Sequence, residues 1–378
     1  MDYNIQMVDL KKQYHRLKSD IDAAIFSTIE NSQFIKGKNF TLFQDELSDF
    51  LGVKKVVACA NGTDALQIAM MALDLKKGDE VIVPAFTYVA TAEVIGLLGL
   101  TPVLIDVDPN SFNTTSTLIE EAITSKTKLI VPVHLFGQCT DMEPIMALAN
   151  KKNLYVAEDT AQAIGAEYTF KNGSTKKAGC IGHIGTTSFF PSKNLGCYGD
   201  GGATFCDDLD LAEKMRMIAN HGQSTQYVHD IIGINSRLDE MQAAILRVKL
   251  KELNYFAAKR NEAAKFYDNE LKDIENLQTP SRDNNSTHVF HQYTIKVKGG
   301  MRDNLKNYLK ERGIPSMIYY PKPLHLQNAF KNIARKVGDL KVATQLCSEV
   351  LSLPIHTEMT QEELVYISNT IKSFFNGK

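Results

Sequence analysis

Several features that mark specialised classes of protein are missing from this sequence of 378 residues. No apolar run approaches the roughly 20 residues that cross a membrane, and the first residues lack the basic and apolar character of a secretion signal. A net charge of -2 gives no support to nucleic-acid binding, which would call for clustered Lys and Arg. The six cysteines form no CxxC pair and no metal-ligand spacing, which predicts reduced thiols in a cytoplasmic protein without a metal site.

The common nucleotide-binding motifs are also missing. The run Gly199-Asp200-Gly201-Gly202 lacks the third glycine of a G-x-G-x-x-G turn, and it does not follow the first strand. No G-x-x-x-x-G-K-[ST] loop occurs, and the histidines lack the spacing of zinc ligands. Dinucleotide, nucleoside triphosphate and zinc chemistry are therefore not favoured.

Apolar runs and helical patterns alternate through the first half of the chain. Runs suited to buried parallel strands occur at 55–60, 80–84, 102–107, 128–133 and 154–158. Helical patterns separate them at 64–73, 88–98, 116–123 and 142–152. With one further strand on each side of Lys193, this order predicts an α/β fold with a mostly parallel seven-stranded sheet and helices on both faces.

The pattern changes after residue 250. Helices are expected at 238–251, 254–271, 302–312 and 361–374, and a strand at 291–297. We therefore expect a large domain over 1–250 and a smaller α+β domain over 251–378. Earlier helices are expected at 9–31, which could pack on the small domain, and at 41–51, where Gly52 would end the helix.

Polar residues follow the strands at the sheet edge where such folds bind ligands. The first strand leads into Asn61-Gly62-Thr63, a small turn before a helix that suits a phosphate, with Thr63 able to cap the helix. Tyr88 and Asp159 follow later strands. Lys193 lies in a glycine-rich turn after an apolar run; it is either a half-buried amine nucleophile or a surface lysine at a hairpin tip.

Pyridoxal phosphate would use each of these groups. Its aldehyde needs a lysine, its ring nitrogen an acidic partner, its ring a flat apolar face, and its phosphate the donors of a helix end. Taken singly, Asp159 could be a helix N-cap, Tyr88 a packing residue and Ser188 a strand hydroxyl. Their convergence at one edge favours the cofactor.

The sequence resembles the DegT/DnrJ/EryC1/StrS sugar aminotransferases, which are fold-type I pyridoxal-phosphate enzymes. The resemblance covers nearly the whole chain. It is carried by the motifs Asn61-Gly62-Thr63-Asp64-Ala65-Leu66, Pro84-Ala85-Phe86-Thr87-Tyr88, Glu158-Asp159-Thr160-Ala161-Gln162, Ser188-Phe189-Phe190-Pro191-Ser192-Lys193-Asn194-Leu195-Gly196, Asn235-Ser236-Arg237-Leu238-Asp239, Tyr319-Tyr320-Pro321 and Pro323-Leu324-His325.

The resemblance implies a role for each site residue. Lys193 would hold the cofactor and then move a proton between cofactor and substrate, while Asp159 pairs with the ring nitrogen. Cofactor contacts would come from Gly62, Thr63, Tyr88, Gln162, Ser188 and, from a neighbouring subunit, Asn235, so the active unit would be a homodimer with shared sites. Substrate contacts would come from Phe34, Ser192, Arg237, Tyr319, Tyr320 and His325. By their patterns alone, Phe34 could instead be a hydrophobic staple and Arg237 a salt bridge at a helix start.

The implied reaction moves an amino group from glutamate to a ketone of a nucleotide-linked sugar, for a surface polysaccharide such as lipopolysaccharide. A dehydratase branch of the family carries histidine in place of Lys193. The sequence looks most similar to enzymes that aminate C3 of a UDP-linked 3-keto-N-acetylglucosaminuronate, whose carboxylate Arg237 could bind bidentately. Tyr319, Phe34 and His134 depart from the residues expected in the uronate enzymes. The same reaction on another 3-keto or 4-keto (6-deoxy) sugar stays open, as does a non-catalytic or regulatory relative.

Overall fold

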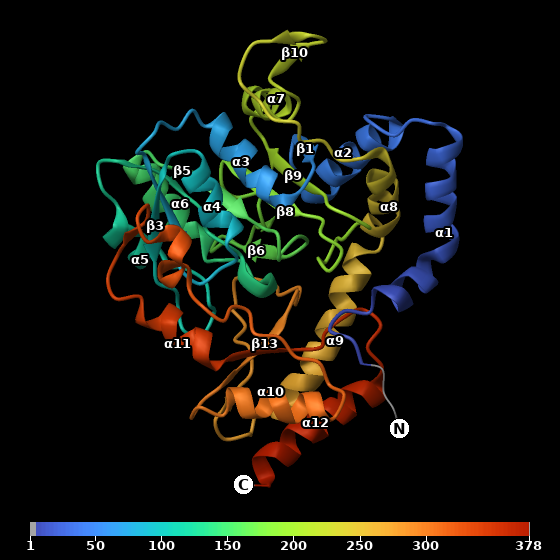
Figure 1. The fold of residues 1–378 in the computed structure, drawn as a ribbon, viewed down its shortest axis with the longest axis vertical. Coiled ribbons are helices and arrows are strands. Elements are labelled where there is room, and N and C mark those ends of the chain that lie inside the picture. The colour runs from blue at the N-terminus through green and yellow to red at the C-terminus, as the bar shows by residue number, and fades with distance from the viewer. Residues whose placement is uncertain (1–4, 378) are drawn as a thin grey trace.

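The computed structural model describes residues 5–377 and has a twisted sheet at its centre (Figure 1). Within these residues the sheet has eight strands in the order β1-β9-β8-β5-β4-β2-β3-β14. The strands are β1 (Lys55–Cys59), β2 (Glu80–Pro84), β3 (Thr101–Ile105), β4 (Thr127–Ile130), β5 (Tyr155–Asp159), β8 (Ile184–Ser188), β9 (Gly202–Cys206) and β14 (Arg335–Lys336). Strand β9 runs antiparallel to β1 and β8, and the other neighbours are parallel, which confirms a mostly parallel sheet.

The eighth strand, β14, was not among the seven predicted. It consists of two basic residues and so lacks an apolar pattern. It pairs with β3, and the Arg335 guanidinium donates to both carboxylate oxygens of Glu80 at 2.9 Å. This edge strand therefore depends on contacts between residues that are far apart in the sequence.

Both faces of the sheet are covered because its strands are apolar on both sides. In β2, Val81 and Val83 point into one cluster and Ile82 into another. The first cluster lies under α3 (Gly62–Ala72), α4 (Ala90–Leu97), α7 (Leu209–Ile218) and α11 (Lys341–Glu349). The second lies under α5 (Ser116–Ala122) and α6 (Met142–Lys152).

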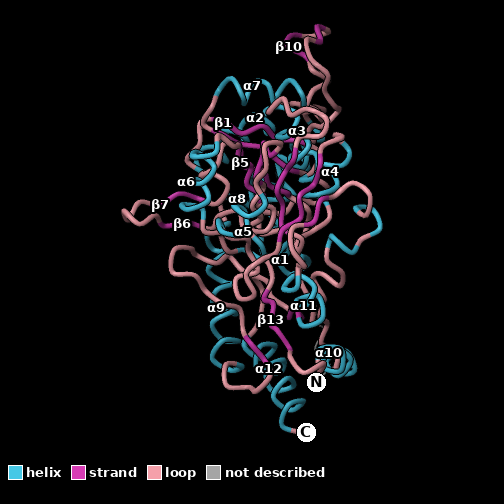
Figure 2. Tube along the Cα trace, turned by 90° about the vertical axis from the view of Figure 1, so that its left-hand side faces the viewer, coloured by secondary structure: helices cyan, strands magenta, loops and turns pink. Residues whose placement is uncertain are grey.

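The remaining helices pack beside β1 and β9 or belong to the C-terminal part of the chain. The other helices are α1 (Leu10–Glu30), α2 (Lys38–Leu51), α8 (Glu240–Leu250), α9 (Leu253–Leu271), α10 (Arg302–Glu311) and α12 (Gln361–Asn376). A second, antiparallel sheet consists of β12 (Leu277–Gln278), β13 (Tyr293–Val297) and β15 (Val350–Leu353). Two hairpins, β6 (Glu167–Thr169) with β7 (Thr175–Lys177) and β10 (Gln223–Thr225) with β11 (Val228–His229), project from the body (Figure 2).

The helix α1 lies beside α8, which also packs on α2 (Figure 1). Its residues Leu17 and Ile21 join the cluster between these helices. Its first turn also reaches the C-terminal part, where the Lys12 ammonium donates to Glu363 at 3.0 Å. The helix thus bridges the two parts, whose division near residue 250 stays a prediction.

Several local features differ from the predictions. Helices α7 and α11 and both hairpins were not predicted, although the side chain of Asp208 caps α7. The predicted cap at Thr63 is wrong: α3 begins at Gly62, two residues before the predicted start, and the side chain of Asn61 accepts from the amide of Asp64. Gly52 ends α2 in the left-handed conformation, as predicted. Among the described residues, no helix is both long and apolar enough to cross a membrane.

Candidate active site

A cavity of about 820 Å³ lies at the carboxyl ends of the parallel strands. The edge of the sheet predicted to bind a ligand is thus hollowed. Ten of the predicted site residues line the cavity: Gly62, Thr63, Tyr88, Asp159, Gln162, Ser188, Ser192, Lys193, Tyr319 and Tyr320.

Lys193 projects into this cavity from the turn that follows β8. The backbone amide of Lys193 donates to the carbonyl of Phe190 at 2.8 Å, which fixes the start of its side chain. Burial lowers the pKa of Lys193 to about 8, and the carboxylate of Asp159 only partly opposes this shift. A part of the amine is therefore uncharged near neutral pH, as a nucleophile requires, and the alternative of a surface lysine is not met.

Asp159 ends β5, and each of its carboxylate oxygens has a donor. The hydroxyl of Thr91 donates to Oδ2 at 2.9 Å, and the amide of Ala161 donates to Oδ1 at 3.1 Å. The carboxyl group is thus held in one orientation at the cavity wall. No helix begins at Asp159, so the alternative of a helix N-cap is wrong.

A second buried carboxylate, Glu158, lies behind Asp159. It accepts from the amides of Gly179, Ile181 and Gly182 and contacts Nε2 of His134 at 2.8 Å. The Nδ1 atom of His134 accepts from the amide of Thr140, so Nε2 carries the proton that is donated to Glu158. His134 is fully buried and is not among the residues that line the cavity. The histidine found where serine was expected therefore holds Glu158 of β5 and does not line the cavity.

The turn before α3 fits a phosphate group. The amides of Gly62 and Thr63 precede the first intrahelical donor, so the helix offers them no acceptor. A side chain on Gly62 would place Cβ 2.6 Å from Cβ of Ser188, so glycine permits this close approach of α3 and β8. The two amides and the hydroxyl of Ser188 can donate hydrogen bonds to a phosphate, and the positive end of the helix dipole favours its negative charge.

Aromatic rings form another wall of the cavity. The ring of Tyr88 lies 6.3 Å from that of Tyr320, and Tyr88 is 57% exposed, which argues against a packing role. The Nε2 group of Gln162 donates to the hydroxyl of Tyr320 at 3.0 Å, while its Oε1 accepts from the amide of Phe136. Burial raises the pKa of Tyr319, so its hydroxyl stays protonated. A flat ring could be held against Tyr88.

Four predicted residues lie outside the lining of this cavity: Phe34, Asn235, Arg237 and His325. Phe34 is 49% exposed, and Asn235 is exposed in the loop before α8. Within residues 5–377 the side chain of Arg237 forms no hydrogen bond or ion pair, so the alternative that it forms a salt bridge at the helix start is wrong. His325 contacts the hydroxyl of Thr344 through Nε2 at 3.3 Å. The roles of these four stay predictions.

Some lining residues were missed by the sequence analysis. They include Asn61, Phe136, Asp200, His291 and Gln292. His291 is buried, and desolvation together with the charges of Lys193 and Arg260 lowers its pKa well below the ordinary value. It comes from the segment before β13, for which the sequence showed only a strand pattern. The motif around Asn61 was found, but its role as the cap was not.

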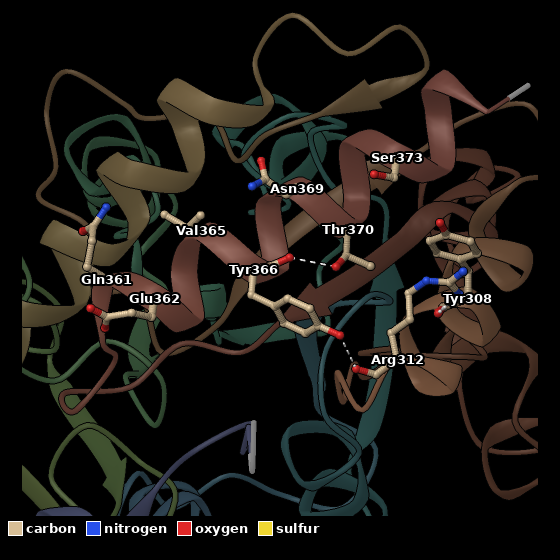
Figure 3. Close-up of a pocket in the computed structure, with 9 residues that line it drawn as sticks. All are labelled: Tyr308, Arg312, Gln361, Glu362, Val365, Tyr366, Asn369, Thr370 and Ser373. Carbon is tan, nitrogen blue, oxygen red and sulfur yellow. Dashed lines mark hydrogen bonds between the residues drawn. The ribbon is translucent and has the colours of Figure 1, made fainter. Parts of the chain in front are cut away.

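A second hollow of about 540 Å³ lies between α10 and α12 and shares no residue with the cavity of Lys193 (Figure 3). The hydroxyl of Tyr366 donates to the carbonyl of Arg312 at 2.9 Å, and that of Thr370 donates to the carbonyl of Tyr366. Its charged residues, Arg312 and Glu362, are exposed. It combines no amine with a carboxylate in a buried setting and offers no comparable chemistry.

Residues 15–372 match the family model described as the DegT/DnrJ/EryC1/StrS aminotransferase family. The chain belongs to this family. Family membership confirms the predicted aminotransferase class and fold. In the solved structures, the chain superposes on a member of the family from Brucella abortus with a TM-score of 0.94 at 41% identity, over 99% of this chain and 100% of that one.

Relatives with assigned names are similar over nearly their whole length. A UDP-2-acetamido-2-deoxy-3-oxo-D-glucuronate aminotransferase of Pseudomonas aeruginosa is 45% identical over 93% of this chain and 95% of its own. A UDP-N-acetyl-3-dehydro-alpha-D-glucosamine 3-aminotransferase of Acidithiobacillus ferrooxidans is 44% identical over 99% and 98%. A protein of Geobacillus stearothermophilus named pleiotropic regulatory protein is 43% identical over 98% and 99%.

The predicted cofactor agrees with solved structures on which the chain superposes. NtdA of Bacillus subtilis, which was solved with bound cofactor PMP, has a TM-score of 0.87 at 31% identity over 96% of this chain and 82% of that one. The cavity of the present chain supplies a lysine, a fixed carboxylate and a phosphate-binding turn. These groups fit pyridoxal phosphate.

Proposed function

We propose that the chain transfers an amino group from glutamate to the C3 ketone of a UDP-linked N-acetylated 3-keto sugar, most specifically the glucuronate. The nucleotide-sugar aminotransferase class follows from the family and the named relatives. The observation that carries the chemistry is the shared cavity of Lys193 and Asp159 beside the turn of Gly62 and Thr63. The uronate and glucosamine relatives are 45% and 44% identical to this chain, so the preference for the uronate rests on the proposed role of Arg237.

Each residue of the cavity has a physical task in this proposal. Bound pyridoxal phosphate supplies an aldehyde and a ring that accepts electrons from the substrate carbon. Asp159, held by Thr91 and Ala161, keeps a negative charge where the protonated ring nitrogen would lie. Lys193 provides an amine that can be uncharged near neutral pH and can move a proton. Gly62, Thr63 and Ser188 would anchor the phosphate, and Tyr88 would cover the ring.

The assembly and the location are further parts of the proposal. Asn235 and Arg237 lie outside their own cavity, which supports a homodimer in which each copy completes the site of the other. All six cysteines are free and buried, which fits a cytoplasmic enzyme. An enzyme in this place would supply amino sugars to surface polysaccharide synthesis.

The experiment incubates the purified holoenzyme with glutamate and a panel of UDP-, dTDP- and GDP-linked keto sugars. We expect glutamate to convert the yellow cofactor to its amine form, and mass spectrometry to find an aminated UDP sugar. K193A should lose both responses and keep the fold. Visible absorption that does not change when glutamate is added would contradict glutamate as the donor. Amination of only dTDP- or GDP-linked sugars would contradict a UDP-linked acceptor. Bound cofactor without any transfer would favour a regulatory relative.

A further inference from the structure

Helix α8 carries a buried lysine, Lys249, that faces the turn of Lys193 from behind the cavity. Its side chain is 1% exposed, and no carboxylate of the described chain lies within ion-pair distance of it. Burial lowers the pKa of Lys249 to about 8, and Cys197 only partly opposes the shift. An unpaired buried cation is costly, and a methionine would fill similar space without that cost.

The ammonium of Lys249 contacts two groups of that turn. Nζ donates to the carbonyl of Gly196 at 2.7 Å, and it lies 4.3 Å from the centre of the Tyr198 ring. A hydrogen bond from a charged donor and a cation–π contact are both stronger in a dry setting. These contacts compensate for part of the desolvation, and they fix the backbone three residues beyond Lys193.

The turn itself, Phe189–Gly201, is closed and tight. The amide of Phe189 donates to the carbonyl of Gly201 at 2.7 Å, and the amide of Cys197 donates to the carbonyl of Phe189 at 2.8 Å. A Cβ on Gly196 would lie 2.4 Å from the carbonyl oxygen of Pro191. The backbone of Gly196 is therefore packed directly against that of Pro191, so a bond that holds the carbonyl of Gly196 also restrains the chain between these two residues.

A second residue of α8 holds the same turn. The amide of Tyr198 donates to Oε1 of Gln242 at 2.8 Å, and Nε2 of Gln242 donates to the carbonyl of Tyr198 at 3.4 Å. Gln242 and Lys249 are seven residues apart, about two helical turns, so they lie on one face of α8. That face serves as a rigid support for the turn.

We propose that Lys249 is a positioning residue for the aminotransferase reaction, whose ammonium fixes the carbonyl of Gly196 and the ring of Tyr198 and so aims Lys193 into the cavity. This inference rests on the proposed role of Lys193. The test compares K249M and K249Q with K251M, which makes the same change at an exposed position of the same helix end.

Three measurements are needed: amide hydrogen exchange of residues 189–201 in the cofactor-free protein, the pH midpoint of the visible absorption of bound pyridoxal phosphate, and the single-turnover rate with glutamate. In K249M we expect faster exchange, a midpoint shifted by about one pH unit and a maximal single-turnover rate lowered about 10- to 100-fold, with little change in the glutamate concentration that gives half of this rate. K249Q keeps a donor and should recover part of the loss, and K251M should behave as the unsubstituted protein.

An unchanged absorption midpoint and rate in folded K249M would overturn the inference, even with a lower Tm, because Lys249 would then only stabilise the fold. If K249M does not fold, Q242A replaces it; the same changes in smaller measure are expected, and unchanged values overturn the inference. Failure of the proposed function is separate. It would appear in the unsubstituted protein as no response to glutamate, while hydrogen exchange and absorption still report on Lys249.

Discussion

The hydroxyl of Thr91 on α4 donates a hydrogen bond of 2.9 Å to Oδ2 of Asp159 on β5. Thr91 has no exposed surface and Asp159 is 7% exposed, so this bond is made away from bulk water. The amide of Ala161 holds the other oxygen. The helix that follows Tyr88 thus orients the carboxylate proposed to face the ring nitrogen.

Removal of the Thr91 hydroxyl should therefore weaken catalysis. A hydrogen bond to a charged group contributes about 1.5–3 kcal/mol, so T91V should lower the single-turnover rate with glutamate about 10- to 100-fold. Valine keeps the shape of threonine, and the cofactor should still bind. Stopped-flow absorption of the bound cofactor measures the rate.

The chain offers a matched control for this substitution. Thr114 is also buried, at 3% exposed, but its hydroxyl has no hydrogen-bond partner in the described part of the chain. T114V should leave the rate unchanged and should not lower the Tm. Equal losses of rate in T91V and T114V would mean that the bond to Asp159 has no catalytic consequence.

The lowered pKa of Lys193 predicts a pH dependence of cofactor attachment. Only the uncharged amine attacks an aldehyde, so below pH 8 the attachment rate in cofactor-free protein should rise about tenfold per pH unit. Above about pH 8 it should level off, because the amine is then mostly uncharged. Stopped-flow absorption after mixing with pyridoxal phosphate measures it. A rise that continues to pH 10 would contradict the lowered pKa.

The same pKa affects the stability of the cofactor-free protein. Between pH 8 and 10.5 the unfolded chain holds a proton on Lys193 that the folded chain has released. This contribution to the free energy of unfolding therefore increases with pH across that window. In urea unfolding, the free energy of unfolding of the unsubstituted protein should rise relative to that of K193M from pH 8 to 10.5. A constant difference would indicate an ordinary lysine.

The lysine and the carboxylate were predictable because parallel strands deliver their carboxyl ends to one edge of a sheet. Once the strands were assigned, Asp159 and Lys193 had to approach each other. Thr91 was not predictable, since a threonine inside an apolar helix has the pattern of a packing residue. The partnership of Lys249 with Gly196 joins residues 53 positions apart and has no local signature.

Other features depend on long-range contacts or on a second copy. The basic strand β14 exists because Arg335 meets Glu80, which no local pattern encodes. Asn235 and Arg237 lie outside the cavity of their own chain, so they can contribute to a site only if another subunit brings its cavity close to them. The family resemblance supplied those roles.

Shared sites can be tested by mixing defective subunits. K193A removes the amine of its own cavity, and N235A should weaken the cavity of the neighbour. In a mixed dimer one cavity has both defects and the other has none, so equal random mixing should give about a quarter of the unsubstituted activity. Differently tagged subunits are co-expressed, and transfer by the mixture is compared with each single variant. No recovery would mean that Asn235 serves its own cavity.

The choice between a carboxylated and a hydroxymethyl sugar should depend on Arg237, whose guanidinium has no hydrogen-bond or ion-pair partner within residues 5–377. A bidentate bond to a carboxylate contributes about 1.5–3 kcal/mol, so R237A should lower kcat/KM for the uronate about 10- to 100-fold. For the hydroxymethyl analogue the loss should stay below about threefold, because no charge is left unpaired. R237K keeps the charge but loses the planar fork, and it should fall between the two. Mass-spectrometric rates with both UDP sugars decide the question: equal losses would assign Arg237 to the nucleotide or to the dimer and leave the uronate without a partner.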